Sequence, residues 1–231
     1  MDNWKIEACK MKDSMKKRDL FRMRSFPTNY FDFILDLGAY LGSFSLLARE
    51  LHPNAKIVAI EGSEDPHFKR LITITAGHNI HCECAVIGNG KFLYMNQDRK
   101  DDLFERPDLD LLQFVSFNET GSGYMRQSVS LESIFDKYYE GGKVFIKCNI
   151  EGAERFFVGN DKVTSIIRKC HGITVQLHFK SEYCPDHPVE LFYYHQFKKW
   201  YMQFSDIFTI DYHTSNRRAG QGYLTLIRKQ L

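Results

Sequence analysis

The sequence predicts an α/β fold in which one mostly parallel sheet is doubly wound, with helices on both faces. Two observations support this prediction. Residues 31–35 form an apolar run, a loop with two glycines follows, and apolar residues then recur at helical spacing up to Leu51, which is the order strand, loop, helix. The β-branched run over 56–60 ends in Glu61, and the apolar run over 143–150 is also followed by acidic residues. Strands that alternate with helices in this way are typical of parallel sheets.

The composition is that of an ordinary globular protein. The chain has 231 residues, of which 43% are hydrophobic and 26% charged, so one sizeable domain is expected. We divide it into a basic, helical N-terminal extension over residues 1–30 and a main domain over 31–231. The net charge of +2 gives no general signal for a polyanionic partner. Scattered cysteines, and the lack of an apolar run long enough for a membrane span, predict a cytoplasmic protein with reduced thiols.

The loop after the first strand has the features of a nucleotide-binding turn. Its two glycines can adopt backbone conformations closed to other residues, and the helix that follows begins with N–H groups to which polar ligand atoms can bind. The spacing G-x-x-x-G after an acid disfavours NAD, which requires G-x-G-x-x-G, and no Gly-Lys-Ser/Thr follows to make a P-loop. The candidate ligand-binding residues of this loop are Asp36, Gly38, Ala39, Tyr40, Gly42, Ser43 and Phe44.

The second strand ends in an acid that strengthens this interpretation. Glu61 lies about twenty residues beyond the first glycine, where an acid at a strand tip accepts hydrogen bonds from ribose hydroxyls. Gly62 and Ser63 follow it and are further candidates for contact with the ligand. The combination of Asp36, the glycine loop and Glu61 resembles the S-adenosylmethionine site of class I methyltransferases.

The other elements follow from periodicity and turn residues. Basic and apolar residues are interleaved over 2–24 in the pattern of an amphipathic helix, whose apolar side we expect to pack on the domain. Helices are expected over 67–76 and 188–204, and a strand leading into a helix over 127–135. Further strands are expected over 81–87, 91–95, 172–179, 208–212 and 222–227, with 91–95 outside the doubly wound plan. Residues 96–110 and 118–122 are expected to be loops.

Four blocks together resemble the FkbM family of S-adenosylmethionine-dependent methyltransferases. They are residues 36–45, Glu61, residues 130–134 and residues 146–154. The last block, Lys-x-Asn-x-Glu-Gly-x-Glu, is the most distinctive, but Asn149 stands where the family has aspartate. Gln176 likewise stands where the family commonly has glutamate. The resemblance implies a single Rossmann-like class I methyltransferase domain, closed by a C-terminal antiparallel hairpin, with S-adenosylmethionine as cofactor.

The chemistry of methyl transfer needs few protein groups, because its main requirement is the position of the acceptor against the donor. His178, near the tip of the strand expected over 172–179, is the candidate base, with Glu151 and Glu154 as alternatives. Lys147 could neutralise a developing oxyanion or pair with Glu151, and we favour the ion pair. The loss of negative charge at Asn149 and Gln176 argues against a base or metal ligand at those positions. No metal site is predicted.

Three functions fit these residues. The resemblance implies O-methylation of a small-molecule or glycan hydroxyl. The basic N-terminal helix and Arg217-Arg218 raise the alternative of an RNA methyltransferase, although the sequence has no clear stacking platform for bases. Asn149 and Gln176 raise a third alternative, a catalytically inactive module that binds S-adenosylmethionine. Acceptor, metal dependence and oligomeric state do not follow from the sequence.

Overall fold

The computed structural model describes residues 3–96, 115–116, 123–150, 152–177, 188–216 and 221–229. The strands are β1 (Phe33–Leu37), β2 (Lys56–Glu61), β3 (Ile80–Cys84), β4 (Val86–Gly88), β5 (Phe92–Asn96), β6 (Val115–Ser116), β7 (Gly123–Ser130), β8 (Val144–Cys148), β9 (Gly172–Leu177), β10 (Phe208–Asn216) and β11 (Gln221–Arg228). The α-helices are α1 (Asn3–Arg18), α2 (Ser43–Leu51), α3 (Lys69–Thr75), α4 (Leu131–Tyr138), α5 (Asp161–Lys169) and α6 (Pro188–Met202). Short 3₁₀ turns lie at Met23–Ser25 and Ala153–Phe157, and a π turn at Glu64–Phe68 precedes α3.

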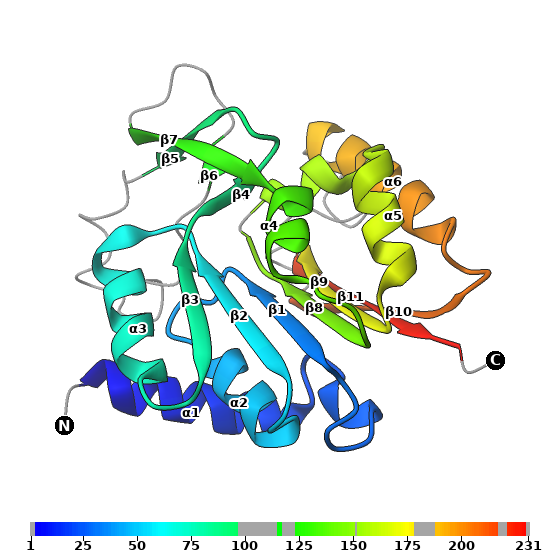
Figure 1. Cartoon of the computed structure of the whole chain (residues 1–231). Coiled ribbons are helices and arrows are strands. Elements are labelled where there is room, and N and C mark those ends of the chain that lie inside the picture. The colour runs from blue at the N-terminus through cyan, green and yellow to red at the C-terminus, as the bar shows by residue number, and fades with distance from the viewer. Residues whose placement is uncertain are drawn as a thin grey trace.

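The main sheet has the predicted doubly wound architecture. Within the described residues its seven strands run in the order β10-β11-β9-β8-β1-β2-β3 (Figure 1). The strands from β3 to β9 pair in parallel, whereas β11 is antiparallel to both β9 and β10. Every residue of β1 and of β8 is buried, as expected for central strands covered on both faces. The mostly parallel sheet and the C-terminal antiparallel hairpin are therefore confirmed.

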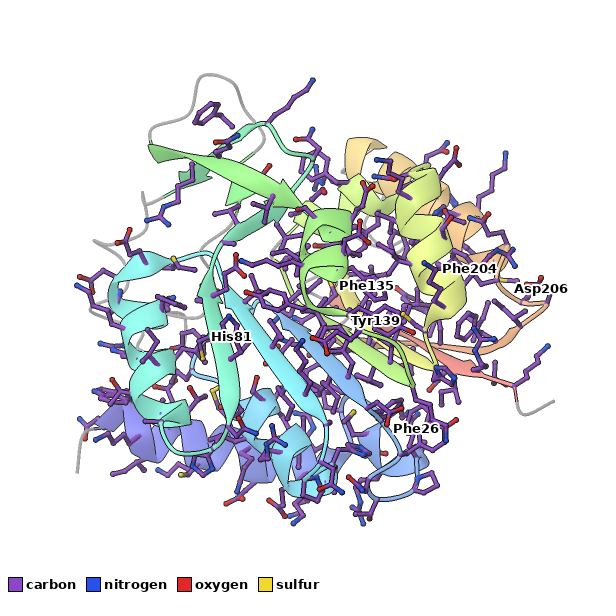
Figure 2. All side chains as sticks on the ribbon, viewed as in Figure 1. Phe26, His81, Phe135, Tyr139, Phe204 and Asp206 are labelled. Carbon is purple, nitrogen blue, oxygen red and sulfur yellow. The ribbon has the colours of Figure 1, made fainter. Side chains whose placement is uncertain are left out.

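Helices cover the two faces of the sheet and define two hydrophobic cores. In Figure 1, α1, α2 and α3 lie on one side of the sheet, and α4, α5 and α6 lie on the other. Adjacent residues of β8 show the separation: Phe145 packs in the core under α2, whereas Ile146 packs in the core under α4 to α6. Figure 2 shows Phe135 and Tyr139 close together beside the sheet, and their ring centroids are 4.5 Å apart.

The N-terminal extension forms a helix as expected, although α1 ends at Arg18 and not near residue 24, and it packs against the main domain. Helix α1 contacts α2, and Ser43 Oγ, in the first residue of α2, donates to Ala8 O over 3.0 Å. Beyond α1, Phe21 is buried and joins the core that contains Phe145. The extension thus shares a core with the sheet. None of the described helices has the combined length and apolar character that crossing a membrane requires.

A second, four-stranded sheet follows β3, in the order β4-β7-β5-β6. The strand expected over 81–87 is divided in two: β3 belongs to the main sheet, and β4 pairs with β7 in the second. The division falls at Ala85, whose N–H donates to Glu61 O over 3.1 Å at the end of β2. The strand expected over 91–95 is confirmed as β5, outside the doubly wound plan. The expected loops over 96–110 and 118–122 fall largely or wholly outside the described residues.

Candidate functional site

Most of the predicted ligand-binding residues meet at the carboxyl ends of three neighbouring strands. Strand β1 lies between β2 and β8, and the parallel register places Asp36 beside Lys147 on one side and Ala59 on the other. The glycine loop leaves β1 at this edge. In open parallel sheets this is the edge at which ligands bind, and here β1 connects to α2 on one face while β8 leads to elements on the other.

Gly38 occupies a position that only glycine can fill. Its φ is +73°, and a Cβ built there would lie 1.7 Å from the backbone oxygen of Asn149. The N–H groups of Gly38 and Ala39 both donate to Ile60 O over 2.9 Å, so they are used within the protein. Gly42 has a φ of +76° and is the N-cap residue directly before α2, and its own N–H donates to Ala39 O. The loop is therefore a fixed turn, tied to the end of β2.

Glu61 organises this turn from the neighbouring strand. Its Oε2 accepts from Tyr40 N over 2.7 Å, and its Oε1 accepts from Ser63 N over 2.9 Å. The Tyr40 bond holds a tyrosine whose φ is +50°, a conformation that L-residues rarely adopt. Burial raises the pKa of Glu61, and the two backbone hydrogen bonds partly oppose that rise. Each carboxylate oxygen retains a lone pair beyond its backbone bond.

Asp36 and Lys147 form a buried ion pair beneath the loop. Lys147 Nζ lies 2.9 Å from Asp36 Oδ1, and the two side chains are 4% and 0% exposed. The second carboxylate oxygen of Asp36 accepts from Ser45 Oγ over 2.6 Å. We expected Lys147 to pair with Glu151, but the partner that the structure gives it is Asp36, which is adjacent in the sheet register. Glu151 and the candidate base His178 lie outside the described residues.

Asn149 lies against the glycine loop. Its N–H donates to Leu37 O over 2.9 Å, while its Oδ1 is buried and has no hydrogen-bond partner among the described residues. Glu154, the third candidate base, is fully buried and accepts from Gly152 N over 2.8 Å. Glu154 thus stabilises the turn after β8. Gln176 lies in β9 opposite Tyr223 of β11.

The remaining predicted residues differ in what they can offer a ligand. Ser43 and Phe44 are buried, the first bonded to α1 and the second packed in the core beside Phe21 and Phe145, so their side chains serve the protein interior. Their N–H groups lie in the first turn of α2, which has no intrahelical acceptor for them. Gly62 and Ser63 continue directly from Glu61.

Two groups near the site were not among the predicted residues. Ser45 bonds to Asp36, and its position in the first turn of the helix after the loop was the available signal. Arg126 of β7 reaches the main sheet, where its guanidinium lies 3.5 Å from Cys84 Sγ and pairs with Glu64. No pattern in the sequence links these distant residues. Among the described residues, no group of three or more His, Cys, Asp or Glu side chains is placed to hold a metal ion.

A scan against protein-family models and a search of curated proteins gave no match. Solved structures do match. An O-methyltransferase from Bacillus cereus in complex with SAH is 12% identical with a TM-score of 0.52, over 99% of this chain and 92% of that one. TomG from Streptomyces achromogenes, an O-methyltransferase involved in tomaymycin synthesis and solved with SAM, is 14% identical with a TM-score of 0.50, over 100% and 91%. This chain therefore has the Rossmann-like fold of class I methyltransferases.

Proposed function

We propose that this protein is an S-adenosylmethionine-dependent methyltransferase of the FkbM type that methylates a hydroxyl group of a small molecule or glycan. The observation that carries the proposal is the arrangement of the glycine loop around Glu61. A buried carboxylate at the tip of β2 fixes the loop through Tyr40 N and still has acceptor capacity. Such an acid beside a glycine turn suits a ribose with two neighbouring hydroxyls.

The residues present fit the proposed cofactor in charge and in hydrogen bonding. S-adenosylmethionine supplies a methyl group on a positively charged sulfur, so a site for it should contain no uncompensated cation. Lys147 meets this condition because Asp36 neutralises it. Asn149 Oδ1 is a buried acceptor without a partner in the described chain, and a polar hydrogen of a ligand would satisfy it. Glu61 would hold the ribose hydroxyls, and the loop would orient the donor.

In the proposed reaction the protein positions the acceptor and, for an acceptor hydroxyl that must be deprotonated, removes its proton. We retain His178 and Glu151 as the proposed bases, because both follow strands that end at the edge carrying the loop. The basic helix α1 offers less to RNA than its composition suggests, since Lys12 and Lys16 both pair with Glu50 of α2. A donor-binding module without activity is the second candidate, favoured by Asn149 in place of the family's aspartate.

Two measurements on the whole chain test the proposal. Calorimetry with S-adenosylhomocysteine should show binding that Glu61→Gln weakens and that Glu140→Gln leaves unchanged, because Glu140 is an exposed carboxylate at the opposite end of β2, paired with Lys56. Incubation with labelled donor and separate pools of sugars, lipids, RNA and protein should then label a sugar or other small hydroxyl compound. Labelled RNA would contradict the acceptor class. Donor binding without any labelled pool would favour the inactive module, and absence of binding would refute the proposal as a whole.

A further inference from the structure

Lys147 makes more contacts around the loop than an ion pair requires. Besides Asp36, its Nζ donates to two backbone carbonyls, Gly38 O at 2.7 Å and Leu37 O at 3.3 Å. An ammonium group has three N–H donors, and these three acceptors can use all of them. The side chain is 4% exposed. The ring of Phe21, from the N-terminal extension, lies 5.9 Å from the Nζ.

We propose that Lys147 is a positioning residue that clamps the first glycine of the loop in its donor-binding conformation, and that it does not act on the acceptor. This inference rests on the proposed function and assigns the lysine a role within it. A lysine that served as base or stabilised an oxyanion would need an N–H or a lone pair facing the acceptor. The three contacts and the burial leave Lys147 none.

The clamp acts on a residue, Gly38, that is held from two sides. The carbonyl of Gly38 is fixed by Lys147, while the N–H of the same residue is fixed by Ile60 O. Together they define the orientation of a residue whose φ of +73° no ordinary side chain favours. Strands β2 and β8 thus each contribute one hydrogen bond to Gly38, and the loop cannot rotate at this residue without losing one of these bonds.

Asp36 and Ser45 extend the clamp to the helix that follows the loop. Asp36 Oδ2 accepts from Ser45 Oγ, so the chain of contacts runs from β8 through β1 to the first turn of α2. The charges of Lys147 and Asp36 also act on Glu61, because the lysine lowers the pKa of the Glu61 carboxyl and Asp36 raises it. Removing the lysine alone would therefore leave a buried Asp36 unpaired and favour the protonated form of Glu61. Both effects act on donor binding.

A pair of variants separates positioning from simple stabilisation. Lys147→Met alone leaves the buried Asp36 carboxylate uncompensated and should lower the denaturation midpoint strongly. The double variant Asp36→Asn with Lys147→Met removes both charges, and Asn can still accept from Ser45, so its midpoint should return near that of the wild type. It still lacks the ammonium that binds Gly38 O. Lys56→Met is the matched control, because this lysine lies at the opposite end of β2 and pairs with exposed Glu140.

Calorimetry with S-adenosylhomocysteine and steady-state kinetics test the proposal on the full chain. The double variant should bind at least tenfold more weakly than wild type, yet its kcat at saturating donor should stay within about threefold, with the same pH profile. Lys147→Arg should also bind S-adenosylhomocysteine more weakly than wild type, because a planar guanidinium cannot direct three donors to these acceptors as an ammonium does. Unchanged donor affinity in the double variant, or loss of an ionisation from the kcat profile, would overturn the proposal.

Hydrogen exchange without ligand tests the clamp independently of the proposed function. The amides of Gly38 and Ala39 should exchange at least tenfold faster in the double variant than in wild type or Lys56→Met. Equal exchange rates would refute the clamp even if donor binds. If the wild type binds no donor but the Gly38 and Ala39 amides exchange faster in the double variant, the proposed function fails while the structural role of Lys147 stands.

Discussion

Replacing Gly38 with alanine tests whether the loop must approach β8 as closely as the structure shows. The new Cβ would lie 1.7 Å from Asn149 O, and this obstacle is backbone, which cannot turn aside as a side chain can. A separation of 3.0 Å, below which real Cβ contacts are essentially absent, requires a shift of more than about 1 Å between the loop and the end of β8. That shift should break one or two hydrogen bonds at about 1 kcal/mol each. The left-handed backbone adds ~1–2 kcal/mol, so about 3 kcal/mol of unfolding free energy should be lost.

Gly77→Ala provides the matched control. Gly77 has a similar φ of +80°, but a Cβ there would meet no atom within 4 Å, so only the conformational cost of ~1–2 kcal/mol applies. Denaturant unfolding measures both stabilities, and calorimetry with S-adenosylhomocysteine measures donor affinity. We expect Gly38→Ala to lose donor affinity by on the order of a hundredfold, or about 2.7 kcal/mol, and Gly77→Ala to keep it. Equal destabilisation of the two variants would refute the steric reasoning, and normal donor binding by Gly38→Ala would remove the loop from the donor site.

Three other changes have defined outcomes. Because burial raises the pKa of Glu61, donor affinity should fall as the pH is lowered through that raised value, and Glu61→Gln should weaken binding about tenfold and abolish this pH dependence in calorimetric titrations. Burial lowers the pKa of His52 from 6.5 to about 4, so up to about 3 kcal/mol of unfolding free energy should be lost as the pH falls from 6.5 through 4. The variant His52→Asn can still accept from Tyr30 N but does not titrate. Unfolding curves measured across that pH range should therefore show a smaller loss in this variant than in the wild type. Asn149→Asp should alter turnover by less than about tenfold, and a native chain without turnover that gains it from this change would show the inactive module instead.

The fold could be predicted from the sequence because its signals are local. Apolar runs that end in acids, glycines at turns and helical periodicity identified the strands of the main sheet and most of its helices. The division of the strand expected over 81–87 could not be predicted, since nothing in its alternating pattern marks a change of sheet at Ala85. The change depends on tertiary contacts, because the residues up to Cys84 pair with β2 whereas those from Val86 pair with β7, which is distant in the sequence.

The strands that carry the candidate site could be predicted from the sequence, but the contacts of its side chains could not. Parallel strands bring their carboxyl ends to one edge, and Asp36, Glu61 and Lys147 lie on three neighbouring strands there. Their partners depend on register, which the sequence does not show. Lys147 is four residues from Glu151 along the chain but directly beside Asp36 across the sheet, and its Nζ lies 2.9 Å from Asp36 Oδ1.

The charges at this edge also explain why asparagine suits position 149. Lys147 compensates the charge of Asp36, so the pair contributes little net charge, and in our proposal the remaining lone pairs of Glu61 accept from the ribose. An aspartate at 149 would place a third carboxylate at this edge, where the Oδ1 is buried and has no partner among the described residues. A buried carboxylate without a cation is far more costly than a buried amide, and its pKa would rise until it bound a proton. Asparagine provides the same acceptor oxygen at no such cost, and therefore fits a site in which position 149 binds a ligand hydrogen and carries no charge.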